Sequence, residues 1–295
     1  MRFGATGGTP LGMNYRHAFH AGNFADVVKH ATLALLIERL KAKEAAFRVI
    51  DTHAGPGLYD LAGDEAGRTG EWHNGIGRIV GRKFAPPMDA LMAPYLEAIA
   101  AANDGKKALR RYPGSPWIIR QMMRRQDRLT AVELHPEDGA ALAALFAGDW
   151  QAKAIELDGW LALGSFVPPK ERRGLVLVDP PYEAPDEFAR MLDAFVKAHR
   201  RWPTGIYLLW YPVKDLDAVQ ALREGLAASG VRRLLRAELN VRARGTPERF
   251  NGSGLVICNP PWQFDAALRD LLMGLAPILA DGTGGGVVID EIAGE

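Results

Sequence analysis

The chain has 295 residues, of which 48% are hydrophobic and 24% charged, as in a globular protein with one large or two ordinary domains. No apolar run reaches the roughly 18 residues of a membrane span. The single Cys258 excludes an internal disulfide, and no Cys/His set has zinc spacing, so we expect a cytoplasmic protein without a metal site. The net charge of +1 gives no overall indication of a nucleic-acid partner.

The N-terminal region divides into a glycine-rich extension and a helix. Residues 1–13 lack the apolar segment of a secretory signal and are expected to be disordered, ahead of one domain over residues 14–295. From Phe24 onward, apolar residues recur at helical spacing and the last turn is rich in Lys and Arg. Asn23 stands where a helix N-cap is expected.

Polar side chains gather around the start of this predicted helix. Tyr15, His17 and His20 precede it, and Lys29 and His30 lie one turn inside it. The solvated face of an amphipathic helix would explain one such histidine. The whole cluster favours a role facing a ligand.

The first predicted strand, residues 47–53, ends in a glycine turn. Gly55 and Gly57 permit a tight turn and let a ligand approach the backbone closely. A lone G-x-G is weak evidence, but here it follows a strand whose last polar residues are Asp51 and His53. The stretch is similar to the first nucleotide-binding loop of a Rossmann-type domain.

The next predicted strand, residues 129–134, comes far later than a simple Rossmann unit requires. There the acidic residue that ends the second strand follows the glycines by about 20 residues. Glu133 has that role in this chain, since a carboxylate at this position accepts the ribose hydroxyls. We therefore predict a helical subdomain inserted at about residues 60–111, with a helix at 88–102, over the carboxyl edge of the sheet.

Basic residues crowd into one region of the chain. They are Lys106, Lys107, Arg110, Arg111, Arg120, Arg124, Arg125 and Arg128. Two interpretations remain open: a face that follows a phosphate backbone, and a solvated helix face.

The rest of the chain alternates strands and helices. Strands are predicted at 154–158, 175–178, 205–213, 233–241 and 254–258, the last two as a hairpin, and helices at 118–125, 187–199, 215–228 and 262–279. Asp158 and Gly159 stand at the tip of the third strand. The fold class is therefore α/β, a Rossmann-like domain with a seven-stranded, mostly parallel sheet.

The motif Asp179-Pro180-Pro181-Tyr182 follows the most apolar strand. Prolines cannot continue the ladder, so the chain leaves the sheet at Asp179, at the edge where ligands bind in open α/β sheets. An amino group on a flat π-system becomes reactive when acceptors take hydrogen bonds from its N–H groups. Asp179 and the Pro180 carbonyl can do so, and Tyr182 can stack on a base. A strand exit capped by an aspartate is the alternative.

A second motif, Asn259-Pro260-Pro261-Trp262, has the same pattern after another apolar strand. By strand count this second motif follows strand 7, far from strand 1. Asp179 follows strand 4, which we expect to lie beside strand 1. We therefore assign the chemistry to Asp179 and a structural role to Asn259.

Together these features resemble a class I S-adenosylmethionine-dependent methyltransferase of the amino-group subset. The blocks YRHAFHAGNFADVVKH, DTHAGPGLY, YPGSP, ELHP, RRGLVLVDPPYE and NPPW more closely resemble the RlmJ family of bacterial 23S rRNA adenine-N6 methyltransferases. The resemblance covers the chain from about Asn14 onward. It implies S-adenosylmethionine as cofactor, S-adenosylhomocysteine as product, and 23S rRNA as partner. We expect no membrane association and no obligate protein partner.

The resemblance also implies site residues. Those for the cofactor are Lys29, His30, His53, Ser115, Glu133, Asp158, Gly159 and Asp179. Those for catalysis are Asp179, Pro180 and Tyr182, and those for substrate RNA are Tyr15 and His17. Only the family supports His30, His53 and Ser115, which otherwise merely lie near predicted turns.

Three alternatives remain open. Adenine in DNA or a protein glutamine amide could be the methyl acceptor, because the same acceptor groups serve both. A nicotinamide-dependent dehydrogenase shares the fold, but the third glycine of its fingerprint is Asp60 here. An RNA-binding module with an inactive site would fail to bind S-adenosylmethionine.

Overall fold

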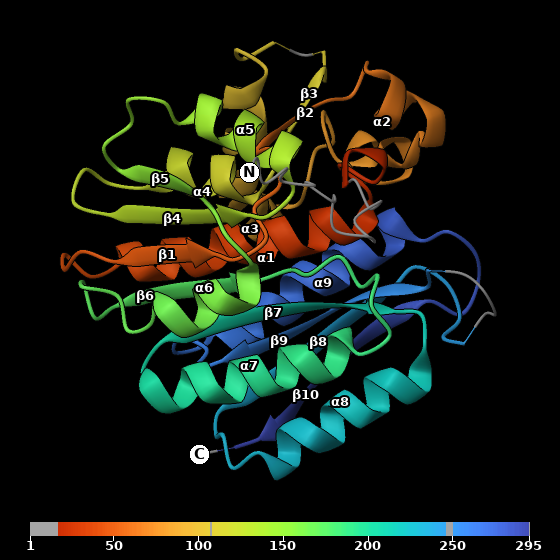
Figure 1. Cartoon of the computed structure of the whole chain (residues 1–295). Coiled ribbons are helices and arrows are strands. Elements are labelled where there is room, and N and C mark those ends of the chain that lie inside the picture. The colour runs from red at the N-terminus through yellow and green to blue at the C-terminus, as the bar shows by residue number, and fades with distance from the viewer. Residues whose placement is uncertain (1–16, 107, 246–249, 295) are drawn as a thin grey trace, which may run out of the picture.

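A computed structural model describes residues 17–106, 108–245 and 250–294. In this part of the chain an eight-stranded sheet has the order β10-β8-β9-β7-β6-β1-β4-β5, with helices on both faces (Figure 1). Its strands are β1 (Arg48–Asp51), β4 (Arg128–Glu133), β5 (Ala152–Glu156), β6 (Gly174–Val178), β7 (Ile206–Val213), β8 (Leu234–Asn240), β9 (Gly252–Cys258) and β10 (Gly286–Ala293). The predicted extension at residues 1–13 and Tyr15 lie outside the described residues.

The predicted count of seven strands is wrong, because β10 adds an eighth at the sheet edge. It pairs antiparallel with β8, from Gly286 opposite Asn240 to Ala293 opposite Leu234. Nothing was predicted after the helix that ends at residue 279. The partner strand lies some fifty residues back in the chain, and strand formation here depends on that distant pairing.

The strands that carry the site are parallel. β1 pairs in parallel with β4 and β6, β4 with β5, and β6 with β7. Every residue of β6 is buried, which explains its unbroken apolar run. In contrast, β9 runs antiparallel to both β7 and β8, so its carboxyl end lies at the opposite edge of the sheet.

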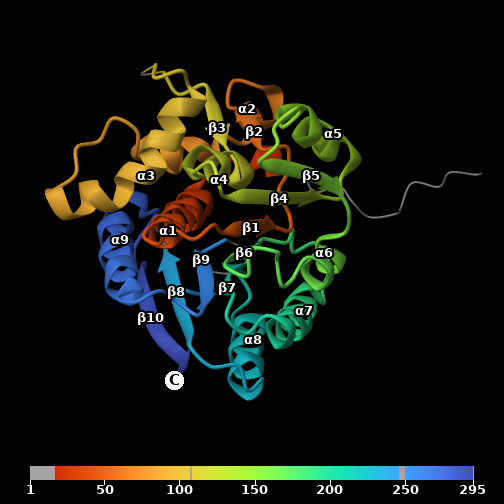
Figure 2. The same cartoon turned by 90° about the vertical axis from the view of Figure 1, so that its left-hand side faces the viewer.

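Helices cover the two faces as two layers (Figure 2). Helices α1, α3, α4 and α9 pack on one face of the sheet and contribute to one hydrophobic core. Helices α6, α7 and α8 pack on the other face and contribute to a second core. The helices are α1 (Phe24–Lys41), α2 (Asp64–Thr69), α3 (Pro86–Ala102), α4 (Ser115–Met122), α5 (Pro136–Leu145), α6 (Gly159–Ser165), α7 (Glu187–Arg201), α8 (Leu216–Ala228) and α9 (Phe264–Leu279). Asn23 caps α1 as expected, since its side chain accepts hydrogen bonds from the backbone N–H of Ala25 and Asp26.

The segment predicted as a helical insertion is closed by a small two-stranded ladder. β2 (Leu58–Asp60) pairs antiparallel with β3 (Arg111–Pro113), and α2 and α3 lie between them. Met92 and Tyr95 of α3 are buried in the same core as α1. The helices of this segment therefore pack on the main body, and its status as a subdomain remains our proposal. No helix among the described residues is long and apolar enough to cross a membrane.

Candidate active site

Four neighbouring strands end at one edge of the sheet and bring the predicted site residues together. Asp51, the last residue of β1, lies between Leu177 of β6 and Ala131 of β4 in the register. Asp179 follows β6 directly, Glu133 ends β4, and Asp158 follows β5 by two residues. Side chains from distant parts of the sequence thus share one edge.

Lys29 and Asp179 form an ion pair at this edge. The Lys29 ammonium donates to Asp179 Oδ2 and lies 2.9 Å from Asp26 Oδ1. Lys29 is 3% exposed, whereas the Asp179 side chain keeps 14% of its surface exposed. Burial alone would lower the pKa of Lys29, but the carboxylates of Asp179 and Asp26 outweigh it and raise the pKa above the ordinary value. Lys29 is therefore a fixed cation whose partner faces the site.

Asp26 is the second carboxylate partner of Lys29, a role that the sequence analysis did not assign. Asp26 Oδ2 accepts a hydrogen bond from the Gly22 backbone N–H at 2.8 Å, and His17 Nε2 lies 3.0 Å from it. Burial opposes ionisation, yet His17, Lys29 and His30 hold the pKa of Asp26 well below its usual range. The spacing of Asp26 and Lys29, three residues apart on a helix, was the available signal.

Asp51 is a buried carboxylate without a hydrogen-bond partner for either oxygen among the described residues. Burial raises its pKa to about 7, helped by the negative charge of Asp179 and opposed by the nearby Ser115 hydroxyl and Lys29. Ser115 is the first residue of α4, so the positive end of that helix points to the same place. A buried acceptor of this kind fits a cationic or hydrogen-bond-donating ligand.

Glu133 is held in position by backbone donors. Its Oε2 accepts from the Gly55 N–H at 2.7 Å, and its Oε1 accepts from the His135 N–H at 2.8 Å. Burial raises its pKa. The glycine turn after β1 and the acid at the end of β4 are therefore one unit, as in a nucleotide-binding edge.

His53 and Gly159 lie against each other. A Cβ on Gly159 would come within 2.4 Å of the Thr52 carbonyl and 2.6 Å of His53 Nε2, so only glycine fits. The His53 ring also contacts Trp160 edge-on at 5.1 Å, and burial lowers the pKa of His53 to about 4. The imidazole is thus neutral, and it packs closely against Gly159 and Trp160.

Asp158 and Tyr182 both have local structural contacts. Asp158 Oδ1 caps α6 by accepting from the backbone N–H of Trp160 at 2.8 Å and of Leu161 at 3.1 Å. The Tyr182 hydroxyl donates to the Trp210 carbonyl at 2.8 Å, which fixes its ring beside Phe188. Asp158 Oδ2 lies 4.0 Å from the Arg190 guanidinium, and Tyr182 remains half-buried.

His30 is buried like its neighbour Lys29 but contacts different residues. Its Nδ1 is 2.7 Å from the Tyr112 hydroxyl, which in turn is 3.1 Å from the Tyr95 hydroxyl. The ring is buried, and burial lowers its pKa to about 3. His30 thus connects α1 to the inserted segment, and its predicted cofactor contact remains a prediction.

The motif at Asn259 lies at the opposite edge of the sheet. Cys258, the last residue of β9, is opposite Tyr207 near the start of β7, because the two strands are antiparallel. The Asn259 side chain donates to the Pro203 and Gly205 carbonyls, each at 2.8 Å. This geometry supports a structural role for Asn259. The physical reason is the antiparallel direction of β9, whereas the sequence analysis had argued from the order of the strands.

Comparisons with known proteins agree with this arrangement. A model of the family described as "Ribosomal RNA large subunit methyltransferase D, RlmJ" matches residues 44–290. Over 273 residues the chain is 40% identical to ribosomal RNA large subunit methyltransferase J of Haemophilus influenzae, covering 92% of this chain and 96% of that protein. The protein of the same name from Escherichia coli is 39% identical with the same coverage. A crystal structure of a Legionella pneumophila protein matches with a TM-score of 0.82 at 31% identity, covering 92% of this chain and 98% of that one.

Proposed function

This chain belongs to the ribosomal RNA large subunit methyltransferase D, RlmJ family and is a ribosomal RNA methyltransferase; we propose that it transfers the methyl group of S-adenosylmethionine to the exocyclic N6 amine of a single adenine in 23S rRNA. The main observation behind this proposal is the position of Asp179. It follows β6 directly, and one of its carboxylate oxygens is paired with Lys29. Its other oxygen has no partner among the described residues and is available to an amine.

The residues at the edge fit the proposed cofactor. Buried Asp51, with both oxygens unpartnered, suits the ammonium of the methionine part. Glu133, oriented by Gly55 and His135, suits the ribose hydroxyls. Gly159 lets its backbone pack closely against His53, and the Asp158 carboxylate beside it is the proposed acceptor for the adenine amine. When bound, the cofactor supplies an electrophilic methyl group on a sulfonium.

The protein groups position and polarise the substrate amine. Asp179 and the Pro180 carbonyl accept hydrogen bonds from the two N–H groups, which localises the nitrogen lone pair toward the methyl donor. Asp179 is also the proposed acceptor of the proton that leaves N6. Lys29 holds the Asp179 carboxylate in place throughout. Catalysis then comes from orientation and preorganised acceptors, without a covalent enzyme intermediate.

The substrate base has to leave its stack to reach Asp179, at a cost of a few kcal/mol. Tyr182 is suited to offset part of this cost, because its ring is fixed by the hydrogen bond to Trp210. We propose that the base stacks there, and that Tyr15 and His17 contact the RNA. His17 touches Asp26 and so lies on the Lys29 side of the site. The proposed compartment is the cytoplasm.

The test is incubation of the protein with methyl-labelled S-adenosylmethionine and 23S rRNA that lacks the modification, followed by nucleoside analysis. We expect labelled N6-methyladenosine at one position and no incorporation into rRNA that already carries it. Label in duplex DNA or in protein, with none in the rRNA, would overturn the proposal. Failure to bind S-adenosylmethionine would point to an inactive RNA-binding module.

A further inference from the structure

Positive charge gathers at the edge of the sheet opposite the candidate site. Residues 38–48, 120–128, 149–153 and 170–173 carry twelve Lys and Arg against five Asp and Glu, in a chain whose net charge is only +1. These segments hold the end of α1, the end of α4, the starts of β1, β4 and β5, and the loop just before β6. We call the surface they form the amino-edge patch. Since the whole chain is nearly neutral, the rest of it is net acidic, and the patch is a local excess.

Of the eight basic residues grouped in the sequence analysis, Lys107 lies outside the described residues, and the other seven do not form a single face. Arg110 belongs to the inserted segment, where its guanidinium lies 4.0 Å from the Asp60 carboxylate. Arg120 lies within the amino-edge patch, where it pairs with Asp149 at 2.5 Å. Arg124, Arg125 and Arg128 lie at the amino edge, together with lysines and arginines from elsewhere in the chain. The structure therefore replaces that grouping with a different set.

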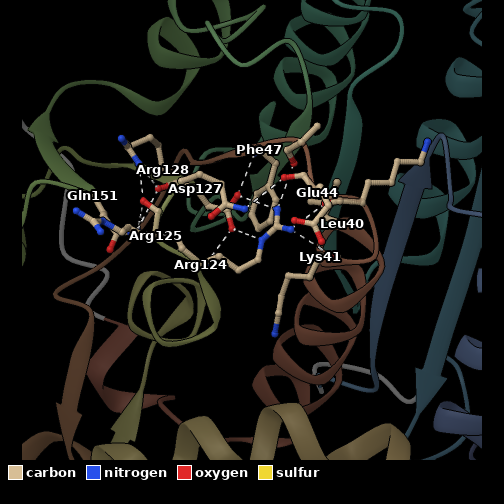
Figure 3. Close-up of polar contacts among 12 residues, drawn as sticks. Leu40, Lys41, Glu44, Phe47, Arg124, Arg125, Asp127, Arg128 and Gln151 are labelled. Atoms are coloured by element: carbon tan, nitrogen blue, oxygen red, sulfur yellow. Dashed lines mark hydrogen bonds and ion pairs between the residues drawn. The ribbon is translucent and has the colours of Figure 1, made fainter.

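Some cations of the patch have a structural role (Figure 3). Arg124 pairs with Asp127 at 2.9 Å and donates to the Lys43 carbonyl at 2.8 Å. Arg173 donates to the Ala45 carbonyl at 2.7 Å. These contacts join the end of α1 to the loops before β4 and β6 and so make the surface rigid.

Other cations of the patch have no such role. Lys43, Arg125, Lys170 and Arg172 are exposed, and their side chains form no hydrogen bond or ion pair with any described residue. The backbone of Arg125 is fixed, since Gln151 Nε2 donates to its carbonyl at 3.3 Å (Figure 3). These side chains are charges on a rigid base, which is the arrangement that contacts phosphates.

An exposed tryptophan stands within the same patch. Trp150 is 60% exposed, two residues before β5, and the Arg128 guanidinium lies 4.4 Å from its ring centroid. Its neighbour Gln151 holds the carbonyls of Arg124 and Arg125. The Arg128 guanidinium contacts the ring by a cation–π interaction and leaves more than half of it open to solvent. This arrangement suits an unstacked base, because aromatic rings and guanidinium planes both stack on bases.

We propose that the amino-edge patch is a second RNA contact, which binds a single-stranded stretch of the substrate away from the methylated nucleotide. Lys43, Arg125 and Arg172 contact phosphates, and Trp150 stacks on a base. The identity of this RNA as ribosomal rests on the proposed function. β1, with four residues, spans about 13 Å, so one folded RNA can reach both edges of the sheet.

The test is equilibrium binding to two unmodified RNAs, a long 23S rRNA fragment and a short hairpin that holds only the target adenine. Trp150→Leu should weaken binding of the long fragment by about 5- to 100-fold, and Trp150→Phe should restore much of it. The triple variant Lys43→Ala/Arg125→Ala/Arg172→Ala should reduce the slope of log K against log salt by about 2 for the long fragment. Neither variant should change binding or methylation of the hairpin, the melting temperature, or affinity for S-adenosylmethionine.

A matched control is Arg269→Ala, which removes an exposed charge from α9 and should leave both affinities unchanged. Unchanged affinity and salt slope of the patch variants on the long fragment would overturn the proposal, as would an equal loss on the hairpin. The two proposals fail separately. If wild-type protein methylates no adenine in either RNA, the proposed function fails, while the affinities still decide whether the patch binds RNA.

Discussion

Lys29 in the first helix is paired with Asp179 at the end of β6, across 150 residues of sequence. The ammonium is buried between Asp179 and Asp26, and these two carboxylates together compensate the buried charge. The orientation of α1 and the position of the D-P-P-Y motif are therefore energetically coupled.

Asp179→Ala removes the proposed acceptor of the amine hydrogen bond. We expect methylation of 23S rRNA to fall by roughly 100-fold or more, because a preorganised charge at the reacting group is lost. The protein should still fold, since Asp26 continues to pair with Lys29. The matched control is Asn259→Ala in the second motif, which should keep its activity per folded molecule. Wild-type turnover of Asp179→Ala would contradict the assignment.

Asp26→Asn leaves Lys29 with one carboxylate and a buried amide. We expect destabilisation of about 3–5 kcal/mol, measured by urea unfolding at neutral pH. The lowered pKa of Asp26 means that its contribution is present above the ordinary value of 3.8 and is lost as pH falls below it. The difference in free energy of unfolding between wild type and variant should thus become smaller at acidic pH. A constant gap down to about pH 2 would argue against this role.

Asp51→Asn tests the buried carboxylate whose pKa is about 7. A raised acid pKa means that the folded state keeps its proton while the unfolded state loses it, so wild-type stability should fall as pH rises from about 4 to 7. The asparagine variant should lack this fall, which melting curves at pH 5 and pH 8 would show. It should also bind S-adenosylmethionine more weakly at pH 8. Equal affinity for the two proteins at pH 8 would speak against the proposed ammonium contact.

Glu133→Ala should act mainly on cofactor binding. The substitution removes the proposed ribose acceptor and frees the Gly55 and His135 N–H groups that hold the glycine turn. We expect affinity for S-adenosylmethionine to fall about 10- to 100-fold by calorimetry, in line with the loss of charge-assisted hydrogen bonds. Glu133→Gln should lose less, because its amide oxygen still accepts. Unchanged affinity of the alanine variant would count against the ribose assignment.

Two glycines in α6 offer a paired experiment. A Cβ at Gly159 would meet the Thr52 carbonyl at 2.4 Å, whereas one at Gly164 meets nothing within 4 Å. Gly159→Ala should therefore lower the melting temperature and cofactor affinity. Gly164→Ala should be neutral or stabilise by about 0.5–1 kcal/mol, since alanine favours the helix. Similar behaviour of the two variants in melting and binding assays would show that the close packing of Gly159 against Thr52 and His53 is not required for stability or for cofactor binding.

The sequence alone predicted the elements that local patterns determine. The apolar run at 175–178 predicted a buried strand, Asn23 predicted a helix cap, and the prolines after Asp179 marked where the chain leaves the sheet. The α/β class and the family followed from motifs in one linear order. These features were accessible because periodicity, capping and proline chemistry act over a few residues.

Only the tertiary structure decided what depends on pairing between distant segments. It added β10 through its ladder with β8, and it placed Asn259 on the other edge because β9 runs antiparallel to β7. It also set Asp26 and Asp179 on either side of Lys29 and collected the amino-edge patch from four separate stretches. Strand direction and burial arise when the whole chain packs, so no local sequence window contains them.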